Sequence, residues 1–160
     1  MEEKRNRIAI VRIRGDIRVD ARVKNTMKLL RLYRKNSCTV VPNNKQHIGM
    51  LKKVKDYVTW GEIEEKTFNE LFKKRARVVG NRQLDEKYLK ENGKISFDDF
   101  TKEFFLFKKE LNDIPGMKKF FRLKPPVHGF ERKGIKIPYS MGGSLGYRGN
   151  AINDLIRRML

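Results

Sequence analysis

Two adjacent carboxylates, Asp98 and Asp99, form the part of the sequence that most resembles acid–base machinery. Both follow Ser96, which marks the expected start of a helix, and acidic residues in a first turn interact favourably with the helix dipole. No Ser/His/Asp or Cys/His set with a supporting local motif accompanies them. The sequence therefore predicts a protein that is not an enzyme. An enzyme with its site around the two aspartates is the alternative, and it predicts that Asp98→Asn or Asp99→Asn abolishes turnover without loss of folding.

Calcium binding is a second chemistry to consider, because residues 92–99 imitate the second half of an EF-hand loop. When Gly93 is aligned to the glycine of that loop, Tyr88 and Lys90 fall where carboxylate ligands are needed. The same residues are explained by Gly93 ending one helix and Ser96 capping the next. The sequence therefore predicts a junction between two helices at this place.

Soft metal ligands are scarce. The chain has one cysteine, Cys38, and two histidines, His47 and His128, which lie far apart in sequence. No metal-ligand spacing can be assembled from them, and Cys38 is interpreted as a buried, inert thiol. We expect neither a metal nor any other cofactor.

A glycine-rich run at residues 142–149 could suggest a nucleotide-phosphate loop. It lacks the Gly-Lys-Ser/Thr ending that contacts phosphate and Mg²⁺, and no strand is expected before it, so an NTPase site and a small-molecule substrate are not predicted. Exposed backbone N–H groups in turns form concavities that bind anions, which favours an approach of this loop to RNA phosphates. A plain surface loop is the alternative.

Basic residues alternate with aromatic ones between residues 121 and 148, and this is the most informative pattern in the chain. Cations contact phosphates, and aromatic rings can stack on unpaired bases. Only one acidic residue, Glu131, lies in the stretch, which argues against a merely solvated run of charge. The cations are Arg122, Lys124, Arg132, Lys133, Lys136 and Arg148, and the rings are Phe130, Tyr139 and Tyr147.

The positive charge is segregated along the chain, which carries a formal net charge of +19. Residues 1–60 hold 16 basic and 5 acidic side chains, residues 61–117 hold 12 of each, and residues 118–160 hold 10 and 2. Such one-sided segments call for a polyanionic partner. No apolar run approaches the roughly 20 residues of a spanning helix, and the first residues lack a signal-peptide core, so we expect a cytosolic protein without a membrane partner. The first cationic patch is Arg12, Arg14, Arg18, Arg22, Lys24 and Lys28.

The elements that position this patch form a β-α-β-α-β unit over residues 1–61. Strands are expected at residues 7–15, with Arg12 and Arg14 on one face, at 37–41 and at 57–61. Apolar residues at helical spacing predict two amphipathic helices between the strands, both packed on one face of a small sheet. The apolar positions are Val19, Val23, Met27 and Leu30 in the first helix, and Ile48, Leu51 and Val54 in the second.

Three further segments follow: a helical extension at residues 62–117, a basic glycine-rich loop at 118–149 and a C-terminal helix at 150–160 that packs back on the core. The loop cannot bury enough apolar surface to be a domain by itself, so it needs outside support. Expected details are a capping box of Thr67 with Glu70, a packing stripe of Phe97, Phe100, Phe104, Phe107 and Leu111, an N-cap at Asn150, and a last stripe of Ile152, Leu155, Ile156 and Met159.

Several stretches resemble one protein family. Residues 10–12, 23–32, 39–42 and 49–58 look like its short bacterial form, and residues 121–126, 129–136 and 142–149 look like its archaeal long form. The family is the universal large-ribosomal-subunit protein thirty, whose long form includes the eukaryotic large-subunit protein seven. Val127 and His128 stand where more basic or glycine-rich residues are expected, which affects one local contact.

The resemblance implies an α+β fold in which a ferredoxin-like unit, a three-stranded antiparallel sheet with two helices, carries a C-terminal extension. It also implies a structural constituent of the large ribosomal subunit in the cytoplasm, which binds large-subunit ribosomal RNA beside neighbouring large-subunit proteins and supports translation. Charge alone indicates only RNA or DNA, and an RNA-binding protein outside the ribosome is the alternative. The expected RNA-binding residues are the six of the first patch with Arg122, Lys124, Arg132, Lys133, Lys136, Tyr139, Tyr147 and Arg148.

Overall fold

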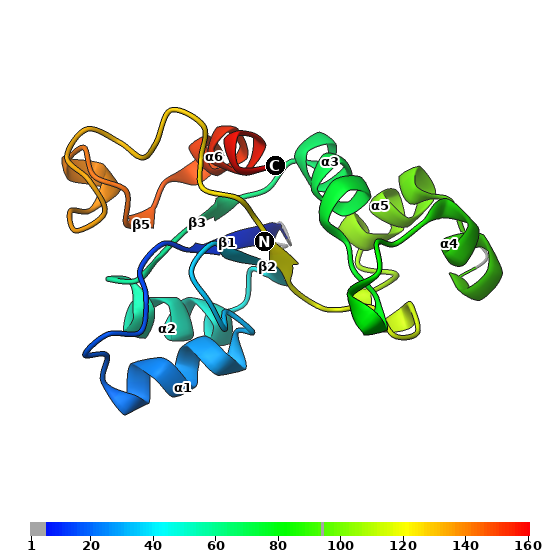
Figure 1. Cartoon of the computed structure of the whole chain (residues 1–160), viewed down its shortest axis with the longest axis horizontal. Coiled ribbons are helices and arrows are strands. Elements are labelled where there is room, and N and C mark those ends of the chain that lie inside the picture. The colour runs from blue at the N-terminus through cyan, green and yellow to red at the C-terminus, as the bar shows by residue number, and fades with distance from the viewer. Residues whose placement is uncertain (1–5, 94) are drawn as a thin grey trace, which may run out of the picture.

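A five-stranded sheet with helices on both faces organises the chain in a computed structural model that describes residues 6–93 and 95–160 (Figure 1). The strand order is β4-β2-β1-β3-β5. The α+β class predicted from the sequence is confirmed. The strands are β1 (Arg7–Arg12), β2 (Ser37–Pro42), β3 (Val58–Glu62), β4 (Phe121–Arg122) and β5 (Gly146–Tyr147). The helices are α1 (Ala21–Leu29), α2 (Lys45–Val54), α3 (Glu65–Arg75), α4 (Glu86–Gly93), α5 (Phe97–Phe105) and α6 (Ile152–Met159).

The centre of the sheet is β1, which pairs antiparallel with β2 on one side and β3 on the other. Because successive side chains of a strand point to opposite faces, Ile8 and Ile10 face one layer while Ala9 and Val11 face the other. Ile8 and Ile10 join the core beneath α1 and α2, and the predicted apolar stripes face it except at Ile48, which is 38% exposed and was wrongly expected to be buried. Ala9 and Val11 join the core beneath α3, α5 and α6. Every residue of β1 is buried, which a strand covered on both faces requires.

The sheet has two strands more than the expected three. The C-terminal part of the chain supplies both: β4 pairs antiparallel with β2, and β5 pairs parallel with β3. Each is two residues long, too short to give a periodic pattern in sequence, so the sheet was predicted without its edges. These strands place the beginning and the end of the basic loop on opposite edges of one sheet.

The helical extension is held together by aromatic rings. Phe68 of α3 stacks on Phe104 of α5, with ring centroids 4.5 Å apart, and Phe72 stacks on Phe100 at 5.0 Å. Phe121 of β4 meets Phe68 edge to face, at 6.4 Å, which ties the extension to the sheet. Phe107 and Leu111 lie beyond the end of α5, because Phe107 has a positive φ of 58° that a helix cannot contain.

Two expected caps are wrong and two are confirmed. Helix α3 begins at Glu65, directly after β3, so Thr67 lies inside it as a buried residue instead of capping it. Asn150 lies in a 3₁₀ turn that runs straight into α6, so it caps nothing. Ser96 does cap α5, accepting a hydrogen bond from the backbone N–H of Asp99, and α4 ends at Gly93 as expected.

Helix α6 lies against α3 and β3, with Ile152, Leu155, Ile156 and Met159 fully buried. Its Asn153 accepts a hydrogen bond from the backbone N–H of Glu64 at 2.9 Å and donates to the carbonyl of Glu62 at 3.1 Å. No helix in residues 6–93 and 95–160 is long and apolar enough to cross a lipid bilayer.

Candidate nucleic-acid interface

Four of the six cations of the first patch are exposed. Arg18 lies in the loop before α1, and Arg22, Lys24 and Lys28 project from the helix away from the sheet. Asp20 caps α1 by accepting from the backbone N–H of Arg22 at 2.8 Å. Lys24 and Lys28 are four residues apart and so lie one above the other on the same side of the helix, where like charges repel.

The other two cations of the patch serve the fold. Arg12 is buried, and its guanidinium donates to the carbonyl oxygens of Arg14 and Leu32 at 2.9 and 2.8 Å and to the carboxylate of Asp16. The hydrogen bond from Arg12 lowers the pKa of Asp16. Arg14 is half-buried, lies over the ring of Tyr57 and donates to the carbonyl of Asp56 at 3.0 Å. Because β1 is covered on both faces and ends at Arg12, these two arginines do not form an exposed cationic face of the strand.

The second set of cations is divided between the two edges of the sheet. Arg122 and Lys124 are exposed at β4, whereas Arg132, Lys133 and Lys136 are exposed on the loop that leads to β5. Four strand spacings separate β4 from β5, about 19 Å at about 4.8 Å each. The chain crosses between the edges by passing the end of α6, where the backbone N–H groups of Lys124 and Val127 donate to Met159 and Arg158.

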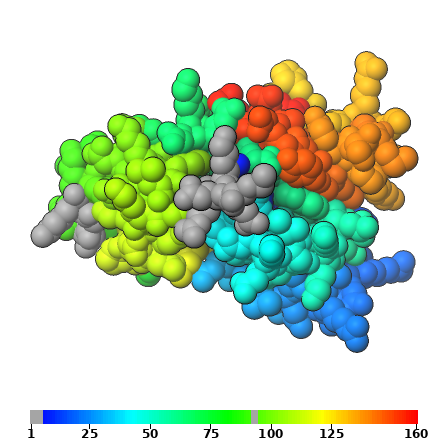
Figure 2. Space-filling view, turned by 180° about the vertical axis from the view of Figure 1, so that it is seen from behind, coloured from blue at the N-terminus to red at the C-terminus, as the bar shows by residue number. Residues whose placement is uncertain are grey.

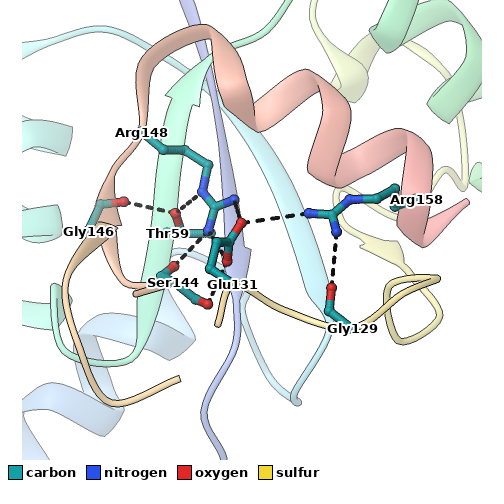
Figure 3. A network of polar contacts seen from close by, with 7 residues as sticks. All are labelled: Thr59, Gly129, Glu131, Ser144, Gly146, Arg148 and Arg158. Carbon is teal, nitrogen blue, oxygen red and sulfur yellow. Dashed lines mark hydrogen bonds and ion pairs between the residues drawn. The ribbon is translucent and has the colours of Figure 1, made fainter. Parts of the chain in front are cut away.

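A buried arginine holds the loop against the sheet (Figure 3). The side chain of Arg148, 1% exposed, pairs with Glu131 at 2.8 Å and donates to the carbonyl of Ser144 and the hydroxyl of Thr59, both at 2.9 Å. Ser144 donates to Glu131 at 2.6 Å, and Arg158 of α6 approaches the same carboxylate at 3.6 Å. Arg148 was predicted as an RNA-binding residue, but its guanidinium is buried and makes its contacts within this internal network.

Glu131 is the only carboxylate that this network contains. Burial by itself raises its pKa, but hydrogen bonds from Arg148 and Ser144 outweigh burial and lower the pKa below the ordinary value of 4.5. Glu131 is therefore charged near neutral pH and neutralises the buried guanidinium. The loop segments that carry residues 129–131 and 144–148 are joined by this pair.

Glycines let the loop fold closely on itself and on the sheet. A Cβ added to Gly143 would lie 2.0 Å from the carbonyl oxygen of Ile137, and one added to Gly61 would lie 2.0 Å from that of Gly149. The carbonyl of Gly146 accepts from the Thr59 hydroxyl at 2.8 Å. These three glycines thus serve contacts within the chain.

Tyr139 and Tyr147, the two aromatic residues predicted to bind RNA, differ in how far their rings are exposed. Tyr139 is half-buried, and the guanidinium of Arg148 covers its ring at 4.7 Å. Tyr147 is 57% exposed, and its hydroxyl donates to the carboxylate of Glu62 at 2.9 Å. That hydrogen bond raises the pKa of Tyr147. The Tyr147 ring is fixed at its hydroxyl end while much of its surface remains open for stacking.

The loop and the first patch meet at one end of the molecule. A cavity of about 190 Å³ is lined by Arg14, Ile17 and Lys35 from the N-terminal unit and by Ile135 from the loop. Figure 2 shows the α1 region in blue and the loop in orange at the same end, with the helical extension at the other. The exposed cations gathered at this end are Arg18, Arg22, Lys24, Lys28, Arg132, Lys133 and Lys136.

The remaining chemical candidates are not organised for catalysis or metal binding. Asp98 is exposed, accepts from Asn69 and Lys73, and has its pKa lowered by these hydrogen bonds, which gives no proton donor near neutral pH. Cys38 is buried in β2, and burial raises the pKa of its thiol to about 12. Among the residues that the structure describes, no three His, Cys, Asp or Glu side chains gather where they could hold a metal ion.

Sequence reasoning missed a group of basic and aromatic residues at the β4 edge. Tyr33, Arg34, Arg77, Lys118 and Phe120 come together there with Arg122 around two adjoining cavities. They come from three separate segments of the chain, and Arg77 belongs to the segment whose charges balance overall. No spacing rule could have joined them; only their being basic or aromatic was visible in the sequence.

Comparisons with known proteins point to one family. Residues 8–58 match the model of the family described as ribosomal protein L30p/L7e. The large ribosomal subunit protein uL30 of Methanopyrus kandleri is 46% identical over 149 residues, which cover 92% of this chain and 100% of that protein. The proteins of the same name from Nanoarchaeum equitans and Methanococcus vannielii are 47% and 46% identical over 152 residues, with 95% of this chain covered and 97% and 98% of theirs.

Identity at this level runs through the N-terminal unit, the helical extension and the C-terminal loop together, because these alignments cover more than nine-tenths of the chain. The stretches that suggested the resemblance in the sequence lie inside that coverage. The chain therefore belongs to the ribosomal protein L30p/L7e family.

Proposed function

We propose that this protein is a structural constituent of the large ribosomal subunit in the cytoplasm, where it binds large-subunit ribosomal RNA and adjoins other large-subunit proteins. Family membership supports a structural, non-enzymatic role. The observation that carries the RNA assignment is the collection of exposed cations at one end of the molecule, contributed by α1 and by the C-terminal loop. Lys and Arg on such a surface neutralise phosphates and release counterions, so affinity falls steeply with salt.

The division of labour within the chain follows from where the charge lies. We infer that residues 1–61, in a ferredoxin-like arrangement, and residues 118–149 form the RNA-binding parts, that residues 62–117 form a packing extension, and that residues 150–160 anchor the loop. Contact to phosphates is assigned to the exposed cations Arg18, Arg22, Lys24, Lys28, Lys124, Arg132, Lys133 and Lys136, with Arg14 and Arg122 at the margins. Arg12 and Arg148 act by holding this surface in place, and Tyr147 offers a ring for an unpaired base.

Binding of this kind positions RNA and does not read its sequence, because the surface is made of cations and turns and not of residues aimed at base edges. The proposed action is passive: the loop follows the RNA surface and stabilises its local fold. A partner of this size and charge also explains how the protein tolerates a net charge of +19.

Nuclease footprinting of large-subunit RNA with and without the chain tests the proposal. Protected nucleotides are expected to form a compact set, and reversing the charge at Arg132, Lys133 and Lys136 together should remove part of it. The same three reversals at the exposed Lys66, Lys87 and Lys102 of the extension are the matched control and should leave the footprint intact. Sedimentation of cell extracts is an independent test, since a pool found mainly outside large subunits in growing cells would favour an extraribosomal role instead.

A further inference from the structure

Two adjoining cavities of about 150 and 300 Å³ open at the β4 edge of the sheet, which is the yellow arrow in Figure 1. They share Asn81, Lys118, Phe120 and Arg122 as lining residues. The larger cavity reaches the lower end of the size range of small-ligand pockets, about 300 to 1,000 Å³. A pocket of this size admits one small group and excludes a double helix.

The walls of this pocket are positively charged. Arg34 lines the larger cavity, Arg77 the smaller one and Arg122 both, and within residues 6–93 and 95–160 none of the three forms an ion pair with a carboxylate. The ammonium group of Lys118 donates to the Asn81 side chain at 3.3 Å. No Asp or Glu is among the lining residues. Guanidinium groups that converge without a counter-charge form a site for an anion.

Aromatic rings form the other part of the wall. Tyr33 and Phe120 meet edge to face with their centroids 5.4 Å apart, and Tyr33 is 48% exposed. In an edge-to-face contact the edge of one ring covers one face of its partner, so this contact leaves the other ring faces uncovered, and a ring face is the surface on which a nucleobase stacks. An inorganic anion or an acidic peptide would use the cations but would have no use for the rings.

We propose that this pocket accepts a single unpaired nucleotide of RNA, whose base stacks on the Tyr33–Phe120 pair while its phosphate is held by Arg34, Arg77 and Arg122. The site rests on the proposed function in taking RNA as partner, but it lies across the sheet from the loop cations. A bulged nucleotide beside a helix is the form of RNA that fits, because an unstacked base can be turned out of the duplex and into the pocket.

The test compares two RNA hairpins of the same stem, one fully paired and one with a single unpaired purine, by measuring their binding to the full chain at moderate salt. The bulged hairpin is expected to bind about tenfold more tightly, the size of one base–aromatic stacking contact. Replacing both rings, Tyr33→Leu with Phe120→Leu, should abolish that preference and leave binding of the paired hairpin unchanged.

A second variant, Arg34→Gln with Arg122→Gln, keeps the rings and removes two exposed charges, so it tests the site even if the ring variant folds poorly. It should reduce the preference for the bulge, whereas Lys66→Gln with Lys87→Gln, matched in charge but outside the pocket, should not. Equal binding of both hairpins by the unaltered protein would overturn this proposal alone, as would capture of a glutamate-rich peptide in place of the bulge. Failure to bind either hairpin would overturn it together with the proposed function.

Discussion

At the scale of single residues, the pair of Glu131 and Arg148 decides whether the loop keeps its place. Glu131→Gln removes the counter-charge of a guanidinium that has almost no access to water. Breaking such a pair leaves a buried cation without full compensation, and we expect the free energy of unfolding to fall by about 1–3 kcal/mol. Urea unfolding of the variant checks this, with Glu70→Gln, an exposed glutamate of α3, as the control that should change little.

The ion pair of Glu131 and Arg148 also makes the free energy of unfolding depend on pH, with stability lost in acid. The pKa of Glu131 in the folded protein lies below its ordinary value of 4.5, so the folded state favours the charged form. Its contribution to stability is therefore complete above about pH 4.5 and is lost as the pH falls through the folded pKa. Glu131→Gln should lose less stability than the unaltered protein between pH 5 and pH 3. Parallel acid profiles for the two proteins would contradict this.

The residue types in the sequence indicated which side chains could bind RNA, but they did not indicate which of these side chains would be buried by contacts within the fold. Arg12 and Arg148 stand in basic stretches like their exposed neighbours, and both are buried. Their burial depends on carbonyl and carboxylate partners from other segments, such as Leu32 for Arg12 and Glu131 for Arg148. Sequence patterns report local periodicity, and these partners are 20 and 17 residues away.

At the scale of elements, the rings between α3, α5 and β4 attach the extension to the sheet. Phe68 is fully buried and contacts Phe72, Phe104, Phe105 and Phe121. Phe68→Ala should lower the free energy of unfolding by about 3–5 kcal/mol, since it leaves a cavity at a point where three elements meet. Leu106→Ala, at an exposed position just after α5, should cost less than about 0.5 kcal/mol in the same denaturant experiment.

The turn that brings the loop back to the sheet depends on a missing side chain. Gly143→Ala would drive a methyl group into the backbone carbonyl of Ile137, which cannot move aside as a side chain could. We expect residues 137–145 to open, with a loss of about 1–3 kcal/mol and faster amide hydrogen exchange in this segment. Gly15→Ala has open space around it and should leave exchange unchanged; equal protection in both variants would show that the turn can adapt.

The elements themselves were predictable to the extent that they carry a repeating apolar pattern. The strand at Ser37–Pro42 and the cap of α5 at Ser96 followed from local composition. Strands β4 and β5 did not, because two residues show no period and their pairing partners are far away in sequence. The same long-range contacts place Arg122 and Lys124 at one edge of the sheet and place the loop that carries Arg132, Lys133 and Lys136 at the other edge.

At the scale of the whole molecule, charge and packing occupy different ends. The helical extension, with balanced charge, surrounds a cluster of phenylalanines, and the opposite end presents α1 and the loop. Arg7 connects the two parts: its guanidinium lies 3.8 Å from the ring of Phe104, donates to the Phe104 carbonyl at 2.8 Å and pairs with Glu110. Through these contacts the extension is packed against β1, the central strand of the sheet.

This separation predicts how salt will act on binding. Each phosphate contact contributes about 0.7–0.9 to the slope of log affinity against log salt concentration. Neutralising Arg132, Lys133 and Lys136 together with glutamine should therefore reduce the slope for large-subunit RNA by about 2–3, because three exposed cations leave the same surface. Neutralising Lys66, Lys87 and Lys102 changes the net charge by the same amount, but these lysines lie on the helical extension and not on the surface formed by α1 and the loop. If attraction came from total charge, both triple variants would lose the same slope; if it comes from the surface formed by α1 and the loop, only the first will.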